Sequence, residues 1–153
     1  MTFRPRAFAA FSACAVTLSL IAGFAIAQSE DAQGDLRMMG QCKGCAFNGD
    51  SFAGRSLIGV DFTDATFEAV DFSGADLDIA VFDETRLANV SFASASMQGV
   101  SFSDAVLTDV QFDGADLTGA SFDGAVVDMM ELDQAVLCNT QMPNDLLDNS
   151  DCD

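Results

Sequence analysis

Residues 70–89 read VDFSGADLDIAVFDETRLAN, and this stretch decides the fold. A large apolar residue stands at every fifth position of it: Phe72, Leu77, Phe82 and Leu87. The same frame continues in both directions, so that every fifth position from Phe47 to Leu137 is Phe, Leu, Met or Val. Neither the α-helical period of 3.6 residues nor the strand period of 2 produces a strict period of five. The spacing therefore predicts a chain built of short structural repeats.

Two further columns accompany the large residues. Two positions before each of them, from Val60 to Ala135, the residue is Ala or Val, except for Thr85 and Met130. Two positions after the large residue, eight repeats carry glycine: Gly49, Gly54, Gly59, Gly74, Gly99, Gly114, Gly119 and Gly124. Asp, Ser and Thr dominate the slots beside the large residue. Because Gly, Asp and Ser favour tight turns, each five-residue unit is expected to bend once.

The units at residues 70–74 (VDFSG) and 115–119 (ADLTG) match the A-(D/N)-L-x-x unit of the pentapeptide repeat family. The chain resembles this family from residue 45 to about residue 142. The resemblance implies an all-β fold, a right-handed quadrilateral β-helix with four pentapeptides per coil and nearly five coils. Each coil of such a solenoid buries its apolar side only against its neighbours, so the two ends need caps.

Four units per coil place residues twenty positions apart on the same face. One predicted stack contains Phe52, Phe72, Phe92 and Phe112, and the opposite stack contains Phe62, Phe82, Phe102 and Phe122. Leu, Met and Val, with Phe47 and Phe67, fill the other two faces. We expect the eight stacked phenylalanines to form the structural core.

Residues 1–27 read as a secretory signal peptide. Arg4 and Arg6 precede an apolar run that ends in an A-x-A cleavage pattern at Ala27. The prediction is a secreted or periplasmic bacterial protein, cleaved after Ala27. Two alternatives stay open: an uncleaved membrane anchor, since the apolar run is long enough to span a bilayer, and lipidation at Cys14 in a poor lipidation box.

The remaining chain divides into three parts. Residues 28–44 are predicted to form an N-terminal cap, residues 45–142 the β-helix, and residues 143–153 a C-terminal cap. Proline lacks a backbone donor, so Pro143 is expected to stop the ladder and to leave no extendable edge. Asp50, Arg55 and Met130 break the small-residue rule, so the first and last coils are expected to be less regular.

Four cysteines remain after the signal peptide: Cys42, Cys45, Cys138 and Cys152. An even number in an exported chain predicts disulfides. The two pairs lie at opposite ends of a rod about 20 Å long at the spacing of β-strands, whereas a disulfide needs Cα atoms within about 7 Å. This leaves Cys42–Cys45 and Cys138–Cys152, and it excludes a four-cysteine zinc site. A redox Cys-x-x-Cys pair would need a helix start, which the repeats do not offer.

The chain is strongly acidic, with 24 Asp and Glu against 6 Lys and Arg and a net charge of −18. Removal of Arg4 and Arg6 with the signal peptide takes the net charge to −20. Such a surface repels nucleic acid and anionic lipid and favours cations or basic protein surfaces. The predicted partner is an unknown protein with basic groups, with no nucleic acid bound and no stable membrane insertion after cleavage. The simpler interpretation is a surface selected for solubility.

The sequence offers little for catalysis. It has no His, Tyr or Trp and a single lysine, Lys43, which leaves no obvious general base near neutral pH. Carboxylates such as Asp113 and Asp133, or Asp83 and Asp123, would share a face as in a glycosidase pair, but a convex rod has no pocket to desolvate them. We therefore expect no enzyme, no catalytic residue, no cofactor and no metal site.

The predicted function is an exported, non-enzymatic structural or protein-interaction module with an acidic rod surface. The first alternative is a DNA mimic that binds a topoisomerase. It comes from the resemblance, since acidic family members mimic duplex DNA and bind DNA gyrase. The signal peptide disfavours it, because topoisomerases are cytoplasmic. The second alternative is weak cation binding by the acidic faces, although no calcium-loop spacing is present.

Overall fold

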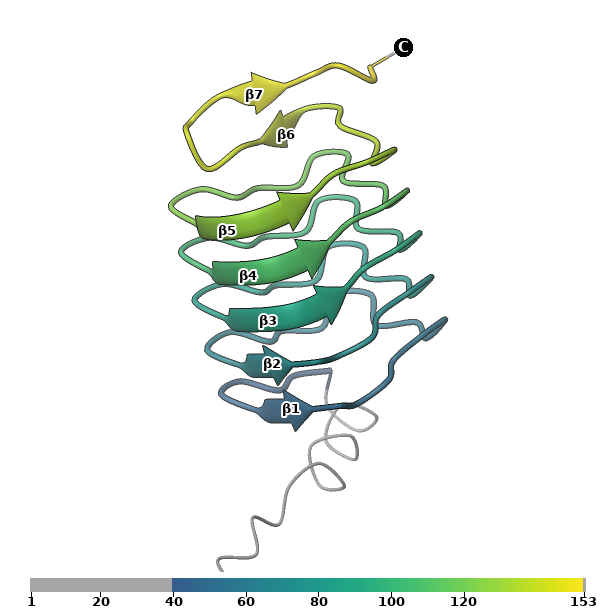
Figure 1. Ribbon diagram of the computed structural model, residues 1–153, viewed down its shortest axis with the longest axis vertical. Coiled ribbons are helices and arrows are strands. Elements are labelled where there is room, and N and C mark those ends of the chain that lie inside the picture. Colours follow the sequence, from purple (N-terminus) through teal and green to yellow (C-terminus); the bar gives the residue numbers. More distant parts are fainter. Residues whose placement is uncertain (1–39, 153) are drawn as a thin grey trace, which may run out of the picture.

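The computed structural model describes residues 40–152, so the predicted signal peptide and most of the predicted N-terminal cap lie outside the described residues. Five strands stack in chain order in one parallel sheet (Figure 1). They are β1 (Ala46–Asn48), β2 (Thr66–Glu68), β3 (Arg86–Ser91), β4 (Val106–Gln111) and β5 (Val126–Glu131). Paired residues are twenty positions apart, as Phe47 with Phe67 and Leu87 with Leu107. One coil therefore takes twenty residues.

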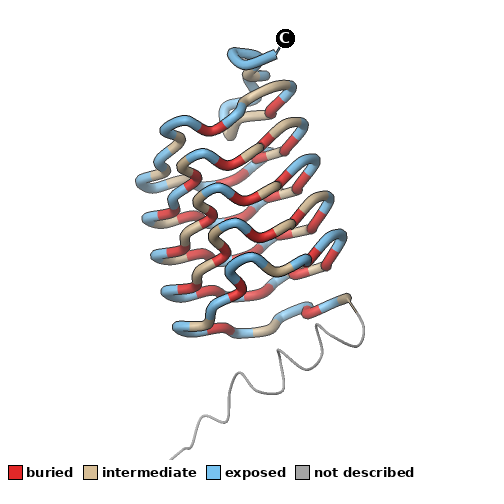
Figure 2. Tube along the Cα trace, turned by 90° about the vertical axis from the view of Figure 1, so that its right-hand side faces the viewer, coloured by how far each residue is buried: buried red, intermediate tan, exposed pale blue. Residues whose placement is uncertain are grey.

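The other three sides of each coil are joined by isolated parallel bridges with the same offset. Examples are Ser51 with Asp71, Ser56 with Asp76, and Asp61 with Val81. Together with the sheet, these bridges give each coil four sides, one for each pentapeptide. Figure 2 shows the stacked coils, with buried positions recurring at regular intervals along the tube. The predicted all-β quadrilateral β-helix is confirmed.

The predicted phenylalanine stacks lie in the buried core, together with the Leu, Met, Val and Ala side chains of the other inward positions. All eight side chains are 0% exposed: Phe52, Phe62, Phe72, Phe82, Phe92, Phe102, Phe112 and Phe122. Successive rings within a stack lie nearly parallel, with centroids 5.1 Å apart for Phe72 and Phe92. Rings from opposite stacks meet edge to face, with centroids 5.7 Å apart for Phe82 and Phe92. Both arrangements are the ones that aromatic quadrupoles favour, so the stacks gain stability beyond the area that they bury.

Each pentapeptide turns through a residue with a positive φ, two positions after the large residue. Glycine occupies many of these corners, but the same conformation occurs at Asp64 (φ 62°), Ala69 (φ 53°) and Ile79 (φ 54°). The corner amide donates to the next coil, as from Asp64 N to Asp83 O at 3.0 Å. The stacked coils therefore impose the corner on whichever residue stands there, including Ile79, whose branched side chain disfavours it.

The chain leaves the solenoid at its C-terminal end through a short antiparallel pair. Strand β6 (Thr140–Gln141) pairs with β7 (Leu147–Asp148), so that Gln141 lies opposite Leu147. Gln141 still belongs to the ladder through its bridge to Ser121, and Pro143 lies in the connection that turns the chain back. Among the described residues, the last bridge of the ladder is thus at Gln141, shortly before Pro143.

The expectation that no extendable edge is left was wrong for one face. Strand β5 is the last strand of the parallel sheet and has a partner strand, β4, on one side only. In a continued ladder Leu147 would lie twenty positions after Val127, on top of β5. The chain turns back at Pro143, before it reaches the face of the parallel sheet again, and Leu147 pairs with β6 instead. The same proline that stops the ladder therefore leaves β5 as an open edge.

Candidate interaction surface

Carboxylates on the outside of the coils are held in place by neighbouring hydroxyl and amide donors. Asp61 accepts hydrogen bonds from the backbone N and the Oγ1 of Thr63, at 3.0 and 2.6 Å. The Asp116 carboxylate accepts from Thr118 in the same way and also from Gln98 Nε2 at 2.7 Å. These contacts fix the direction of the acidic side chains and connect successive coils.

The hydrogen bonds also keep the carboxyl groups ionised. Partial burial alone would raise the pKa of Asp116, but the hydrogen bonds from Thr118 and Gln98 outweigh it and hold the pKa below the ordinary 3.8. The pKa of Asp71 is lowered mainly by hydrogen bonds from Ser73. Among the described residues, every carboxyl group with a resolved shift has a lowered pKa. A general acid would need the opposite shift.

The carboxylate pairs suggested by the sequence do not form a desolvated site. The carboxylate of Asp83 accepts hydrogen bonds from the hydroxyl of Ser101 and from the backbone N of Ser103. Within residues 40–152, no group of three or more acidic, Cys or His side chains is arranged to hold a metal ion. In the same part of the chain, no helix is long and apolar enough to cross a membrane.

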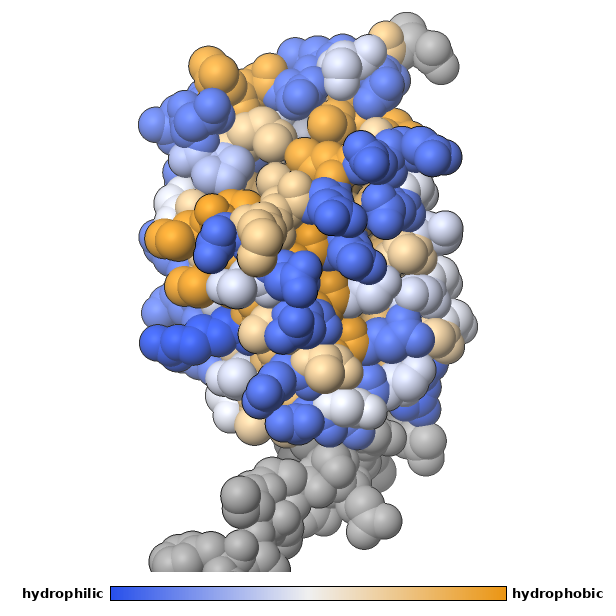
Figure 3. Space-filling view, viewed as in Figure 1, coloured by the Kyte–Doolittle hydropathy of each residue, from blue (hydrophilic) through white to orange (hydrophobic). Residues whose placement is uncertain are grey.

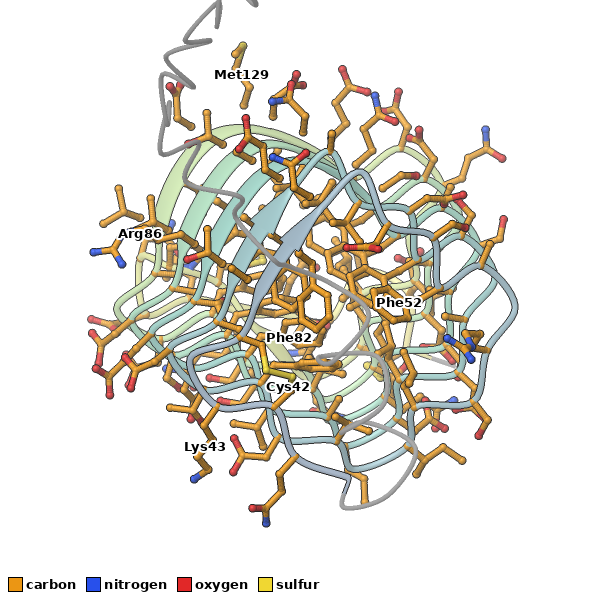
Figure 4. All side chains as sticks on the ribbon, turned by 90° about the horizontal axis from the view of Figure 1, so that it is seen from below. Cys42, Lys43, Phe52, Phe82, Arg86 and Met129 are labelled. Atoms are coloured by element: carbon orange, nitrogen blue, oxygen red, sulfur yellow. A yellow bond between two sulfur atoms is a disulfide. The ribbon has the colours of Figure 1, made fainter. Side chains whose placement is uncertain are left out.

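The few basic side chains of the described rod are spread over different places. Lys43 Nζ forms an ion pair with Asp61 at 2.8 Å, and the hydrogen bond that it donates to this carboxylate raises the pKa of Lys43. The guanidinium of Arg55 lies 5.8 Å from the centroid of the Phe52 ring. In Figure 4, Phe52 and Phe82 lie inside the coils, whereas Lys43, Arg86 and Met129 point outward. Three described bases leave most of the carboxylates without a cationic partner.

A disulfide lies at each end of the rod. Cys42 and Cys45 are joined, with Cα atoms 5.4 Å apart, and Cys42 is buried below the first coil. Cys138 and Cys152 are joined, with Cα atoms 4.9 Å apart. The second disulfide ties the end of the described chain to the last coil, so both predicted pairings are the ones present in the structure.

Large apolar side chains are exposed mainly near the C-terminal end, which the sequence reasoning missed. Those from Val106 onward are Val106, Val126, Met129, Val136, Leu146 and Leu147. Only Ile58 and Ile79 are comparably exposed in the rest of the described chain. Figure 3 shows apolar surface among the charged side chains on the face of the parallel sheet. The sequence contained a signal for this region, because Val126 and Met129 occupy outward positions at which most other repeats carry polar residues or glycine.

The C-terminal cap is hollowed next to this region. A recess of about 580 Å³ is lined by six residues of the β6–β7 connection and of β7: Met142, Pro143, Asn144, Leu146, Leu147 and Asp148. It is open to solvent and contains a single carboxylate, that of Asp148, whose pKa is lowered by hydrogen bonds from Ser150. Its chemistry suits apolar contact and not acid–base catalysis.

Comparison with known proteins gives consistent results. The sequence model of a protein family described as the pentapeptide repeat region matches residues 41–122. A solved pentapeptide repeat protein from the Arabidopsis thaliana thylakoid lumen is 25% identical, over 80% of this chain and 77% of that one, with a TM-score of 0.52. A second, from the cyanobacterium Cyanothece, is 19% identical over 77% and 98%, with a TM-score of 0.38.

QnrB1, a plasmid-mediated fluoroquinolone resistance protein, is 17% identical over 65% of this chain and 52% of its own, with a TM-score of 0.46. Among the curated proteins no match is found. The family match covers more than half of the chain, and it coincides with the stacked coils of five-residue units. The chain belongs to the pentapeptide repeat family.

Proposed function

We propose that this protein is an exported, non-enzymatic protein-interaction module whose acidic rod binds a protein partner that carries basic groups. The observation that carries the proposal is the excess of carboxylates in the whole sequence, 24 acidic against 6 basic residues, together with a rod whose one described lysine is already ion-paired. Hydrogen bonds lower the pKa of Asp71 and Asp116 further below the ordinary value of 3.8, so these groups are fully charged at neutral pH. Such a surface attracts cationic groups and repels phosphates.

Export is supported by the A-x-A pattern at Ala27 and by the two disulfides, which persist in oxidising compartments. The similar Arabidopsis protein also comes from a lumen, that of the thylakoid. N-terminal sequencing of the protein from its own cells should give Gln28 as the first residue. Retention of Met1 would instead favour the anchored form.

A non-enzymatic role is supported by the state of the carboxyl groups. Glycosidase chemistry needs one carboxyl group with a raised pKa beside one that stays ionised. The resolved pKa shifts of the described carboxyl groups are all downward, and the carboxylate of Asp83 accepts hydrogen bonds from two serine residues. A binding role uses the same carboxylates in the ionised state in which the hydrogen bonds hold them.

The interaction is tested by photo-crosslinking in the cells that make the protein. A photoreactive residue replaces Glu68 on β2, Ser103 on another face, or Asp128 on β5, one at a time. We expect at least one position to capture the same protein reproducibly, and capture to fall steeply as added salt shortens the screening length to about 3 Å at 1 M. Failure of all three positions to capture any protein above an unirradiated control would contradict the proposal.

A further inference from the structure

The open edge of β5 distinguishes it from the inner strands β2, β3 and β4, which have a partner strand on both sides. In each lower coil, the corner amide on this face donates to the coil above, as from Gly49 N to Glu68 O and from Ala69 N to Ala88 O, both at 2.9 Å. Met129 occupies the equivalent position in β5, but β5 has a partner strand on one side only. The amides of Val127 and Met129 therefore face away from β4, on the side where the described chain supplies no further strand.

The side chains of β5 are also less covered than those of β4. Leu107 and Val110 of β4 are 0% exposed, whereas Val127 and Met130, twenty positions later, are only partly buried. On the outside, Val126 is 62% and Met129 is 66% exposed. An open, six-residue edge with exposed apolar side chains is a template for pairing with another chain.

Charge decides which chain could pair there. Asp128 and Glu131 are exposed on β5 itself, and Asp109 of β4 lies one coil below, at the corner level with Met129. A second copy would bring an equally acidic surface with net charge −18 or lower, and like charges across an interface oppose association. An extended segment that alternates apolar with Lys or Arg residues would satisfy the open amides, the apolar side chains and the carboxylates together.

We propose that the free edge of β5 is a strand-addition site for an extended, basic segment of another protein. The segment adds a sixth strand to the sheet: main-chain hydrogen bonds to β5 supply the pairing, and contacts with Met129 and with the carboxylate of Asp128 supply the selectivity. This proposal rests on the proposed function and deepens it by naming the site and the chemistry of the partner.

The experiment uses the disulfide-bonded protein and a labelled probe peptide, acetyl-KVKVKVK-amide, with binding followed by fluorescence anisotropy. The control peptide has the same side chains but carries N-methyl groups on the backbone nitrogens of its three central residues, so these residues cannot donate to a strand. We expect the probe to bind and the control peptide to bind at least about tenfold more weakly. Amide hydrogen exchange measured by NMR should slow at Val127 and Met129 when the probe is bound.

A matched pair of protein variants distinguishes binding of the probe at the β5 edge from binding to the overall negative charge of the rod. Asp128→Lys on β5 and Glu68→Lys on β2 make the same charge change in the same column of the face, three coils apart. We expect Asp128→Lys to weaken probe binding about tenfold and Glu68→Lys to change it less than about threefold. The proposal would be overturned if the two variants weakened probe binding equally, or if the N-methylated peptide bound as tightly as the probe. Unchanged amide exchange at Val127 and Met129 in the presence of the probe would also overturn it.

Two other outcomes have distinct meanings. If sedimentation shows dimers without peptide, and exchange at Val127 and Met129 slows as protein concentration rises, the occupant is a second copy and the proposal is wrong. If photo-crosslinking captures a partner at Glu68 or Ser103 while the probe does not bind, strand addition fails and the interaction function stands. Absence of any crosslinked partner would instead count against the proposed function.

Discussion

Strands β4 and β5 are successive coils of the same face, with equal length and a shared register, yet their inward residues have different surroundings. Leu107 and Val110 are fully buried because β3 lies below them and β5 above. Val127 and Met130 are only partly buried because they are covered from one side. In a solenoid, the burial of a core position thus depends on the coils on both sides of it. In the last coil, inward side chains are partly exposed at positions that are fully buried in the inner coils.

The largest expected effect comes from breaking the register of the inner coils. Deletion of residues 70–89 removes one coil and leaves Phe52 below Phe92. The free energy of unfolding should therefore fall only by the contribution of one coil. Deletion of residues 90–94 keeps the five-residue frame but turns every later coil by one face, so phenylalanine meets leucine or methionine. Each mismatched contact costs about 1–3 kcal/mol, and a whole coil boundary contains several. Thermal melts of both proteins with oxidised cysteines measure the difference, and equal stability would refute the face-sorted core.

A smaller effect compares an inner coil directly with the last one. Leu117 is 0% exposed, and Leu137, twenty positions later in the same column, is only partly buried. Leu117→Ala should lower the free energy of unfolding by about 2–5 kcal/mol, and Leu137→Ala by less than half of that, because the end coil leaves less cavity behind. Urea titration of the two variants gives both values. Similar losses would mean that the cap covers the last coil as well as an inner coil does.

Backbone conformation can be separated from packing at one corner of the rod. Ile79 has a φ of 54° and is 62% exposed, whereas Gly119 occupies the same corner two coils later with a φ of 71°. Ile79→Gly should raise the melting temperature slightly, because it relieves a left-handed conformation that costs about 1–2 kcal/mol in a residue with a Cβ atom. Gly119→Ile should lower the free energy of unfolding by a similar amount. A loss of stability in Ile79→Gly would show that its contacts outweigh the strain.

The smallest expected effect is on the pH dependence of stability. The pKa of Asp116 is below its ordinary value of 3.8 in the folded protein, so its ionised form favours folding. This contribution is complete above the unfolded pKa and is lost as the pH falls through the lower folded pKa. Asp116→Asn should therefore reduce the loss of stability between about pH 4 and pH 2, relative to the parent protein. Asp128→Asn is the control, because Asp128 is exposed on the open edge. An unchanged acid profile in Asp116→Asn would assign the loss to other carboxyl groups.

Much of the interior could be read from the sequence because its period is strict. The column of large core residues follows from positions that repeat without interruption. The coil of twenty residues, and with it the sorting of the phenylalanines by face, was implied by the resemblance to the family, and the structure has both. The corners could be read only in part. Glycine marks some of them, but Ala69 and Ile79 take the same left-handed conformation, which a residue-by-residue reading would not assign to them. Cooperative stacking of neighbouring coils overrides the local preference there.

The candidate interaction surface was harder to foresee. The acidic charge is a property of composition, and the two disulfides follow from the position of the cysteines at the two ends of the rod. The open edge of β5 depends on where the chain turns back after Pro143, and on the pairing of Leu147 with Gln141. No periodicity distinguishes that pairing from one more coil, because Leu147 still fits the frame of large residues.

The sequence by itself determined the five-residue unit, the identity of the core residues and the sign of the surface charge, because each depends only on residue type at a fixed spacing. The twenty-residue coil was implied by the resemblance to the pentapeptide repeat family. The tertiary structure alone decided which corner residues adopt a positive φ against their preference, and that β5 has a partner strand on one side only. Both are consequences of stacking: a coil constrains its neighbours through hydrogen bonds along the rod, and the last coil has a neighbour on one side only.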